Sequence, residues 1–251
     1  MSEPASLEIE LISDNILQEE VIFPPGDLLS DEPPLESDIH RDQIDLLIRI
    51  LKLWWRERQD FYASGNLTIY YSPNQKKSEH FRGPDFFVVL GTQKKDRKSW
   101  VVWQEDGKYP NVIVEILSSS TTAVDKGLKK QIYQDTFRTP DYFWFHPVTM
   151  ELQGFHLVDG KYQEIQVTTD GRLWSQQLEL YLGVYEGKLR FFTTENQLIL
   201  SSEELAEQER LRAQQSEERA QQSEKRAQRA EQEIARLREV LRIQGIDPEN
   251  I

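Results

Sequence analysis

The sequence contains no cysteine, and this absence excludes two kinds of construction at once. Without cysteine the chain has no disulfide bonds and no thiolate metal sites. Histidine is also scarce: the four residues stand at positions 40, 80, 146 and 156, and this scattered spacing does not provide zinc ligands. The sequence therefore shows no pattern of zinc ligands.

Long apolar runs are missing as well. No stretch approaches the roughly 20 apolar residues that a membrane-spanning helix needs, and the N-terminus lacks a basic start followed by an apolar segment. A hydrophobic content of 38% with six Trp is typical of a globular domain that carries polar tails. We therefore expect a soluble, cytoplasmic protein that does not associate with membranes.

Basic residues are absent from the first forty positions, and the net charge of −13 is unevenly distributed. Residues 1–40 contain eleven acidic side chains, whereas residues 41–201 contain twenty acidic and twenty-one basic ones. Because the central segment is nearly neutral, the overall acidity does not argue against nucleic-acid binding there. We expect a poorly ordered acidic tail over 1–37, a folded domain over 38–200 and a long charged helix over 201–251.

The central segment alternates between helical and strand patterns. Apolar residues recur at three- and four-residue steps between 38 and 62, which predicts an amphipathic helix, and a second helix is expected over 123–137. Strands are expected over 67–71, 85–90, 100–103, 111–117 and 141–145, with a hairpin over 151–165 and two short strands within 170–195. This order predicts a mixed α/β domain, and none of its segments is typical of a DNA-recognition helix.

The segment after residue 201 repeats a seven-residue unit. Arg212, Arg219 and Arg226 each open one copy, and Ala or an aliphatic residue recurs on a heptad lattice from Ala206 to Leu241. Only residues 227–241 have a strongly apolar seam. Two interpretations remain open: the helix joins a homo-oligomer, most simply a dimer, as a coiled coil, or it is a solvated single helix with many charge pairs.

Two carboxylates interrupt strands that are otherwise apolar. Asp85 follows Gly83 and Pro84 at the start of one strand, and Glu115 stands inside a Val/Ile run. A buried carboxylate is costly unless it is paired or binds a metal, and two on neighbouring strands could hold Mg²⁺ or Mn²⁺. Lys129 lies on the following helix, where it shares one face with Asp125 and Tyr133. The residues alone also permit a structural ion pair between Glu115 and Lys129.

Several segments together resemble one known family. The first segment is Gly83-Pro84-Asp85 with the Phe and Val residues that follow it, and the second is the strand segment 114–118. The third is the helix that carries Asp125, Lys129 and Tyr133, and the fourth is the segment 139–144. Over residues 38–195 this combination is similar to the Uma-two endonuclease-like family of the PD-(D/E)xK restriction-endonuclease-like superfamily. The resemblance implies a mixed sheet of four to five strands flanked by helices, to which the strand pattern of this chain adds hairpins. It also implies a Mg²⁺ or Mn²⁺ site at Asp85 and Glu115.

The resemblance also assigns a role to one lysine. The superfamily motif places Lys two residues after its second acid, but this chain has Leu117 there, so Lys129 matches the catalytic lysine. Asp125 and Tyr133 are supporting candidates. The resemblance therefore predicts a metal-dependent endonuclease that hydrolyses DNA through Asp85, Glu115 and Lys129. The alternative is a catalytically inactive nuclease fold that binds or assembles through its C-terminal helix.

Overall fold

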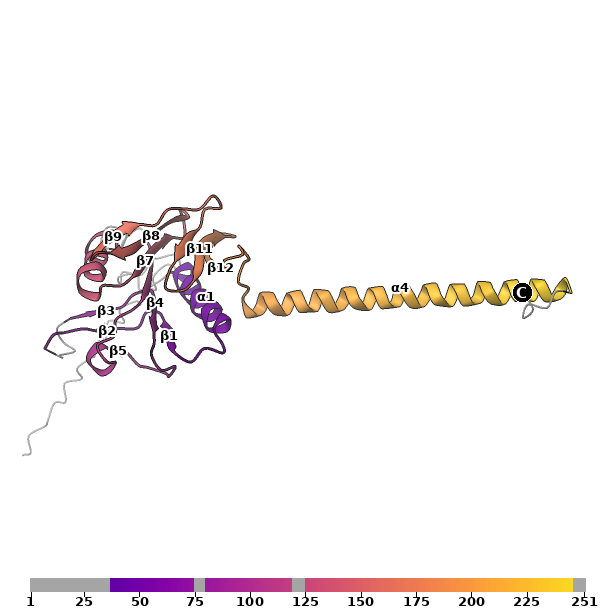
Figure 1. Ribbon diagram of the computed structural model, residues 1–251, viewed down its shortest axis with the longest axis horizontal. Coiled ribbons are helices and arrows are strands. Elements are labelled where there is room, and N and C mark those ends of the chain that lie inside the picture. Colours follow the sequence, from indigo (N-terminus) through magenta and orange to yellow (C-terminus); the bar gives the residue numbers. More distant parts are fainter. Residues whose placement is uncertain (1–36, 75–79, 119–124, 246–251) are drawn as a thin grey trace, which may run out of the picture. The chain divides into compact units, whose positions relative to one another are not determined.

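The computed structural model describes residues 37–74, 80–118 and 125–245 of the chain (Figure 1). The acidic tail expected over 1–37 lies outside these described residues, apart from Ser37. The long helix expected from residue 201 is α4 (Ser202–Ile243). Within the described residues, no helix is long and apolar enough to cross a membrane.

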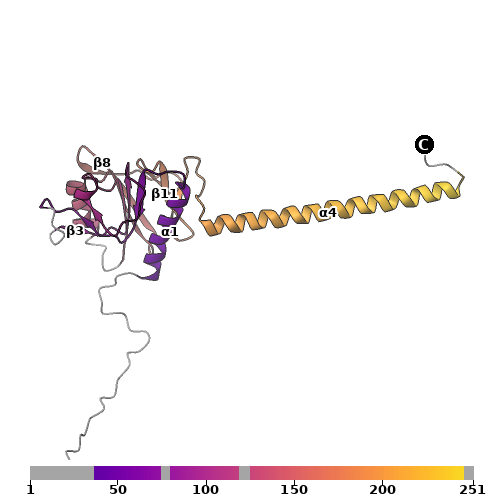
Figure 2. The same ribbon diagram turned by 90° about the horizontal axis from the view of Figure 1, so that it is seen from below.

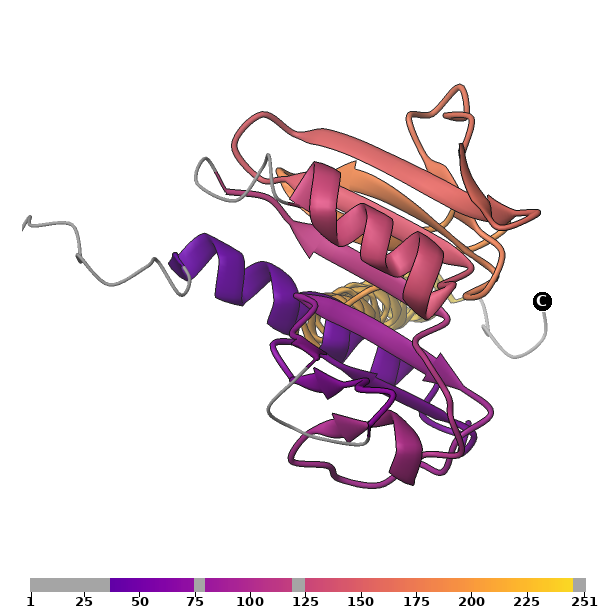
Figure 3. The ribbon, with the colours of Figure 1, turned by 90° about the vertical axis from the view of Figure 1, so that its left-hand side faces the viewer.

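A six-stranded mixed sheet forms the centre of the domain (Figure 3). Its strands lie in the order β1 (Phe61–Ser64), β4 (Phe86–Leu90), β6 (Val112–Ile116), β7 (Asp141–His146), β8 (Glu151–Val158) and β9 (Lys161–Glu164). Only β6 and β7 pair in parallel; the other neighbours are antiparallel. The expected mixed sheet and the β8–β9 hairpin are confirmed, but the sheet is larger than the four to five strands that the resemblance implied.

One face of this sheet is covered by α1 (Asp38–Trp54) and by a second, three-stranded sheet. That sheet consists of β10 (Leu173–Ser175), β11 (Leu180–Tyr185) and β12 (Lys188–Phe192). Figure 2 shows α1 and β11 on the same side of the domain. Residues 170–195 thus contain three strands rather than the two expected. Together these elements bury one continuous aliphatic and aromatic cluster, which contributes the hydrophobic stabilisation of this half of the core.

The opposite face is covered by a short helix and a third sheet. The described part of the helix comprises η2 (Asp125–Lys129), α3 (Lys130–Ile132) and η3 (Tyr133–Phe137), of which η2 and η3 are π-helical. The third sheet has the order β3 (Phe81–Arg82), β2 (Ile69–Tyr70) and β5 (Trp100–Val101), followed by the 3₁₀ turn η1 (Val102–Gln104). Alternation along β6 assigns Val114 to the first face and Ile113 to this one.

The first helix is shorter than its apolar periodicity predicts. Ser37 caps it by accepting a hydrogen bond from the backbone N–H of His40, but the helix ends at Trp54 instead of near residue 62. The chain turns and then enters β1, where Phe61 and Ala63 are each 1% exposed. Because β1 pairs along its whole length with β4, the hydrogen bonds and burial offered by the sheet override helical continuation.

The C-terminal helix begins with a capping box. Ser201 accepts from the backbone N–H of Glu204, and the Glu204 carboxylate accepts from the backbone N–H of Ser201. The same carboxylate accepts two hydrogen bonds, of 2.9 and 2.6 Å, from the guanidinium of Arg190, whose side chain is 4% exposed. Arg49 adds an exposed ion pair with Glu203 at 2.7 Å. These contacts attach the first turn of α4 to β12 and α1.

Candidate functional site

The two carboxylates singled out in the sequence lie opposite one another on neighbouring strands. Phe86 pairs with Val114 in the antiparallel β4–β6 ladder, so extending this register by one residue places Asp85 opposite Glu115. Side chains two residues apart on a strand point to the same face, so Asp85 lies on the face of Phe87 and Glu115 on the face of Ile113. Phe87 and Ile113 belong to the face covered by the short helix. The structure therefore brings together two acids that are thirty residues apart in the chain.

Glu115 is fully buried and has two partners on the short helix. The Nζ atom of Lys129 lies 3.0 Å from Oε2 of Glu115, and the hydroxyl of Tyr133 donates to Oε1 at 2.6 Å. Burial, followed by the negative charge of Glu115, raises the pKa of Tyr133 well above its ordinary value, so the phenol stays a donor. Lys129 and Tyr133 are four residues apart and reach the same carboxylate, as their predicted common face requires.

Asp85 is held by two different elements. Its Oδ2 atom accepts from the backbone N–H of Ile116 at 2.7 Å and lies 3.2 Å from Nε2 of His40. Burial raises the pKa of Asp85, but His40, the positive charge of Lys129 and the Ile116 N–H together outweigh burial and hold this pKa below its ordinary value. The carboxylate is therefore ionised at neutral pH. Both of these contacts use Oδ2, which leaves Oδ1 suited to another ligand.

His40 is the site residue that the sequence analysis missed. It lies in the first turn of α1, where only 9% of it is exposed. The sequence did contain a signal that His40 is buried. His40 precedes Ile44 and Leu47 by four and seven residues, which is the spacing of the buried stripe of this helix. A polar side chain on an apolar helix face needs a partner, and the partner is Asp85.

The other residues near the predicted site are accounted for as follows. Leu117, at the motif position where the superfamily has Lys, is 1% exposed and packs in the apolar cluster under the short helix. Lys130 points elsewhere, with Nζ 3.4 Å from the centre of the Phe155 ring. Asp125 begins the described part of the helix, but its side chain lies outside the described residues. The structure thus brings Asp85, Glu115, Lys129 and Tyr133 together, and it does not test the supporting role expected of Asp125.

The donor set fits a hard divalent cation. Mg²⁺ is commonly bound through one or two carboxylates while it keeps several waters, and Asp85 and Glu115 would supply those carboxylates. Within residues 37–74, 80–118 and 125–245, no group of three or more His, Asp or Glu side chains is arranged as a metal site. A cation here would therefore depend on water and substrate oxygens to complete its coordination.

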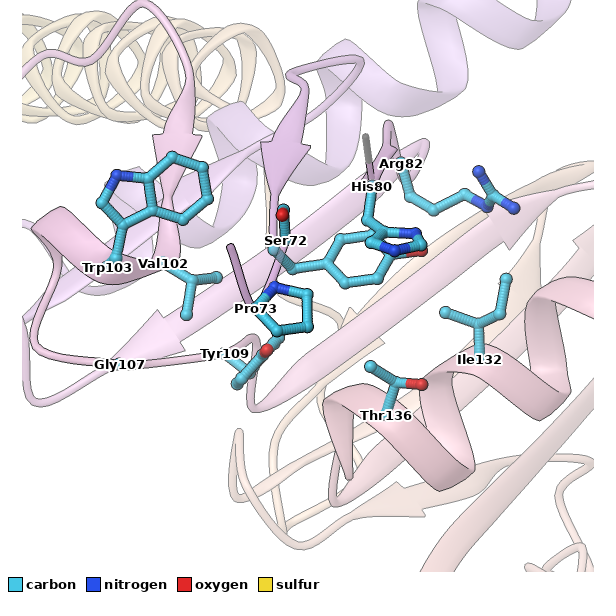
Figure 4. Close-up of a pocket in the computed structure, with 11 residues that line it drawn as sticks. Ser72, Pro73, His80, Arg82, Val102, Trp103, Gly107, Tyr109, Ile132 and Thr136 are labelled. Atoms are coloured by element: carbon cyan, nitrogen blue, oxygen red, sulfur yellow. The ribbon is translucent and has the colours of Figure 1, made fainter. Parts of the chain in front are cut away.

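A cavity of about 680 Å³ borders the same helix (Figure 4). Ile132 and Thr136 line one side of it, and they neighbour Tyr133 in sequence. His80 and Arg82 line the other side, and Arg82 precedes Asp85 by three residues. The remaining lining residues are Tyr71, Ser72, Pro73, Val102, Trp103, Gly107 and Tyr109. The cavity offers aromatic surfaces, a histidine and an arginine, and none of Asp85, Glu115, Lys129 and Tyr133 lines it.

Gly65 lies where three elements of the site meet. A Cβ atom at this position would be 2.2 Å from the carbonyl oxygen of Asp85 and 2.5 Å from Cγ2 of Ile44 on α1. The next residue, Asn66, donates its backbone N–H to the carbonyl of Pro84 at 3.1 Å. This turn therefore positions the backbone of Asp85, and only glycine permits the close approach.

Replacing Gly65 by alanine is expected to lower the free energy of unfolding by about 1–3 kcal/mol, because the added methyl group must displace either Asp85 or Ile44. Urea denaturation measures this loss. Gly127→Ala is the matched control, since nothing lies within 4 Å of a Cβ at that helical position. A Gly65→Ala protein as stable as the control would show that the close approach to Asp85 is not a constraint.

Comparison with known proteins identifies relatives of this fold. A family model named Uma2 and described as "Putative restriction endonuclease" matches residues 16–190. No curated protein matches the chain. One similar solved structure is a crystal structure of a putative nuclease belonging to DUF820 from Anabaena variabilis. It is 10% identical, with a TM-score of 0.44, and the match covers 58% of this chain and 76% of that one.

Proposed function

Because the chain belongs to the Uma2 family, described as putative restriction endonucleases, we propose that it is a divalent-metal-dependent endonuclease that hydrolyses phosphodiester bonds in DNA. The observation that carries this proposal is the pairing of Asp85 opposite Glu115, with Lys129 3.0 Å from the second carboxylate. Two acids and one lysine on adjacent elements are the minimum set for metal-assisted phosphodiester hydrolysis.

Each residue of the site has a distinct task in this proposal. Asp85 and Glu115 would hold Mg²⁺ or Mn²⁺, which when bound polarises a phosphoryl oxygen and lowers the pKa of a coordinated water. The ammonium group of Lys129 lies 3.0 Å from Glu115 and would stabilise the negative charge that develops on the phosphate. Tyr133 keeps the Glu115 carboxylate in place through its 2.6 Å hydrogen bond.

His40 and the backbone of Ile116 serve Asp85 in the same way. Both contact Oδ2, so they orient the carboxylate and favour its ionised form. His40 does not reach toward Glu115 through any contact among the described residues, and we assign it a positioning role. The cavity bordered by Arg82 and His80 would receive the nucleotide next to the scissile phosphate.

A non-catalytic function is the second candidate. The Glu115, Lys129 and Tyr133 contacts also satisfy a buried ion pair that joins the helix to the sheet. The forty-two residues of α4, of which none is buried, would then provide the working surface of a binding or assembly protein. The two candidates differ in one measurable property, which is metal-dependent cleavage.

The deciding experiment is cleavage of supercoiled plasmid DNA. With Mg²⁺ or Mn²⁺ the wild-type protein should produce nicked or linear DNA, whereas EDTA should stop the reaction. Asp85→Asn and Glu115→Gln should each reduce the rate by at least about 100-fold, because each removes one anionic metal ligand without changing the shape of the side chain. Parallel reactions with single-stranded DNA and RNA define the substrate.

Asp96→Asn is the matched control for these two variants. Asp96 is exposed on a loop, so the same chemical change there should leave cleavage unaltered. Equal cleavage by wild type, Asp85→Asn and Glu115→Gln would contradict the proposal and would identify a contaminating nuclease. Absence of cleavage by wild type on all three substrates would favour the non-catalytic candidate.

A further inference from the structure

The long helix α4 exposes apolar residues along one line. Ile234 and Leu237 are 50% and 54% exposed, and Val240 is 43% exposed. In a heptad labelled a to g, position a holds Ala206, Ala213, Ala220, Ala227, Ile234 and Leu241, and position d holds Glu209, Ser216, Ser223, Ala230 and Leu237. Ala, Ser and one Glu form the first half of this seam, and the large aliphatic residues Ile234, Leu237 and Leu241 lie in the second half. The exposed aliphatic half is the part that favours pairing with a second helix.

The residues beside this seam are charged in an ordered way. Between Arg212 and Arg238, position g holds Arg212, Arg219, Arg226 and Glu233, and position e holds Glu217, Glu224, Glu231 and Arg238. In a parallel two-stranded coiled coil, each g residue meets the e residue five positions further along on the other helix. The resulting pairs are Arg212 with Glu217, Arg219 with Glu224, Arg226 with Glu231 and Glu233 with Arg238. All four pairs join opposite charges, including the last, in which both signs are reversed.

Six of these eight charges are not explained by contacts within one helix; the exceptions are Arg212, which has Glu209 three positions away, and Glu233, which has Arg229 and Arg236 within four positions. Charge pairs within a helix require partners three or four positions apart. Arg219 and Arg226 have no acidic residue at those distances, and Glu217, Glu224 and Glu231 have no basic one. The structure agrees: the side-chain bonds to Glu217 and Glu224 come from Gln221 and Gln228. This spacing therefore favours a second helix over a solvated single helix.

The sign pattern also selects the orientation of the two helices. Antiparallel helices bring g residues against g residues and e residues against e residues. Three of the four g residues are Arg and three of the four e residues are Glu, so an antiparallel arrangement confronts mostly like charges. A parallel helix shifted by one heptad would bring Arg226 against Arg238 on one side of the coil and Glu233 against Glu231 on the other. Both are like charges, so the reversed last pair also favours the in-register alignment.

We propose that α4 pairs with α4 of a second copy of this chain in a parallel, in-register, two-stranded coiled coil. The inference rests on the exposed seam and on charge complementarity, and it does not depend on nuclease activity. Because the first turn of each α4 is attached to its own domain through Arg190 and Glu204, parallel pairing joins the two domains at the same end of the coil. The partner is thus an identical chain.

Disulfide trapping tests the orientation directly, since the chain has no native cysteine. Ala213→Cys places a thiol at position a, where an in-register parallel dimer brings it against its own copy. Gln214→Cys, one residue away at position b, is the matched control that faces outward. Under mild oxidation the full-length Ala213→Cys protein should form a cross-linked dimer, and the Gln214→Cys protein should remain largely uncross-linked. A dimer in which Ala213→Cys stays reduced would overturn the parallel arrangement.

Reversing the charges beside the seam tests whether α4 pairs with α4 of an identical chain. Light scattering should give twice the 29.6 kDa of one chain for wild type. Reversing three e residues together (E217K, E224K and E231K) should raise the dissociation constant at least about tenfold at low salt, and reversing three g residues (R212E, R219E and R226E) should do the same. Mixing the two variants should restore a dimer of wild-type affinity. A monomeric wild type, or variants that dimerise as well as wild type, would overturn the proposal.

Discussion

Replacing Lys129 by methionine is expected to lower the rate of plasmid cleavage by about 10²–10³-fold while leaving metal binding intact. Methionine keeps the length and apolar stem of the side chain but removes the charge that lies 3.0 Å from Glu115. If Lys129 stabilises developing charge on the phosphate, the loss falls on turnover. Single-turnover cleavage rates and calorimetric titration with Mg²⁺ measure the two quantities separately.

The same substitution should reduce stability in a way that depends on metal. Without a cation, Lys129→Met removes the positive charge that pairs with the buried Glu115 carboxylate, and breaking a buried pair costs about 3–5 kcal/mol. Added Mg²⁺ should recover part of this loss, because a ligand that binds only the folded state stabilises it. Recovery of stability without recovery of cleavage would separate the catalytic role from the structural one.

Lys130→Met is the matched control on the same helix. Its ammonium lies over the Phe155 ring and away from Glu115, so cleavage should stay within about threefold of wild type. The catalytic assignment of Lys129 fails if Lys129→Met cleaves as fast as Lys130→Met. In that case the contact with Glu115 would be a structural ion pair that joins the helix to the sheet.

Replacing Asp141 by alanine is expected to lower the free energy of unfolding by about 3–4 kcal/mol. Asp141 is 1% exposed at the start of β7 and collects three partners from distant segments. Its Oδ1 lies 2.7 Å from Nδ1 of His156, and its Oδ2 accepts from the Ser175 hydroxyl at 2.7 Å and from the Gln177 backbone N–H at 2.9 Å. Truncation removes the acceptor of all three donors, of which the Ser175 hydroxyl is fully buried.

Thermal and urea unfolding measure this effect, and a domain of this size should melt roughly 10 °C lower. Asp96→Ala, on an exposed loop, is the control and should change stability by no more than about 0.5 kcal/mol. Asp141 also stands in the segment 139–144, which is one of the segments that resemble the nuclease family. The result therefore also distinguishes a structural role of Asp141 from a role in the site. A stable Asp141→Ala protein with reduced cleavage would move Asp141 from the structural framework into the site.

A parallel dimer has a consequence for the proposed nuclease function. Each chain carries one Asp85 and Glu115 pair, and under the proposed function each pair would cut one strand at a time. Joining two domains at the same end of a coiled coil raises the local concentration of the second site after the first has bound DNA. Such an arrangement favours cutting of both strands, and the dimerisation variants separate this effect from the chemistry itself.

The strand that carries Glu115 shows how far sequence reasoning reached. The Val/Ile run over β6 predicted a strand buried on both faces, and its residues are all buried in the sheet. The helix that carries Lys129 was also expected, as was the shared face of Lys129 and Tyr133. The end of α1 was predicted wrongly, because pairing between β1 and β4 decided it and periodicity within one segment does not contain that information.

The sequence by itself determined the local properties of this protein. The apolar strands, the buried stripe of α1, the capping box of α4 and the spacing of the charges beside its seam are all patterns of residues that lie within a few positions of one another in the chain. Only the tertiary structure decided that His40 and the Ile116 N–H hold Asp85, while Lys129 and Tyr133 hold Glu115. These side chains come from separate elements, and their meeting depends on how α1 and the short helix pack on opposite faces of one sheet.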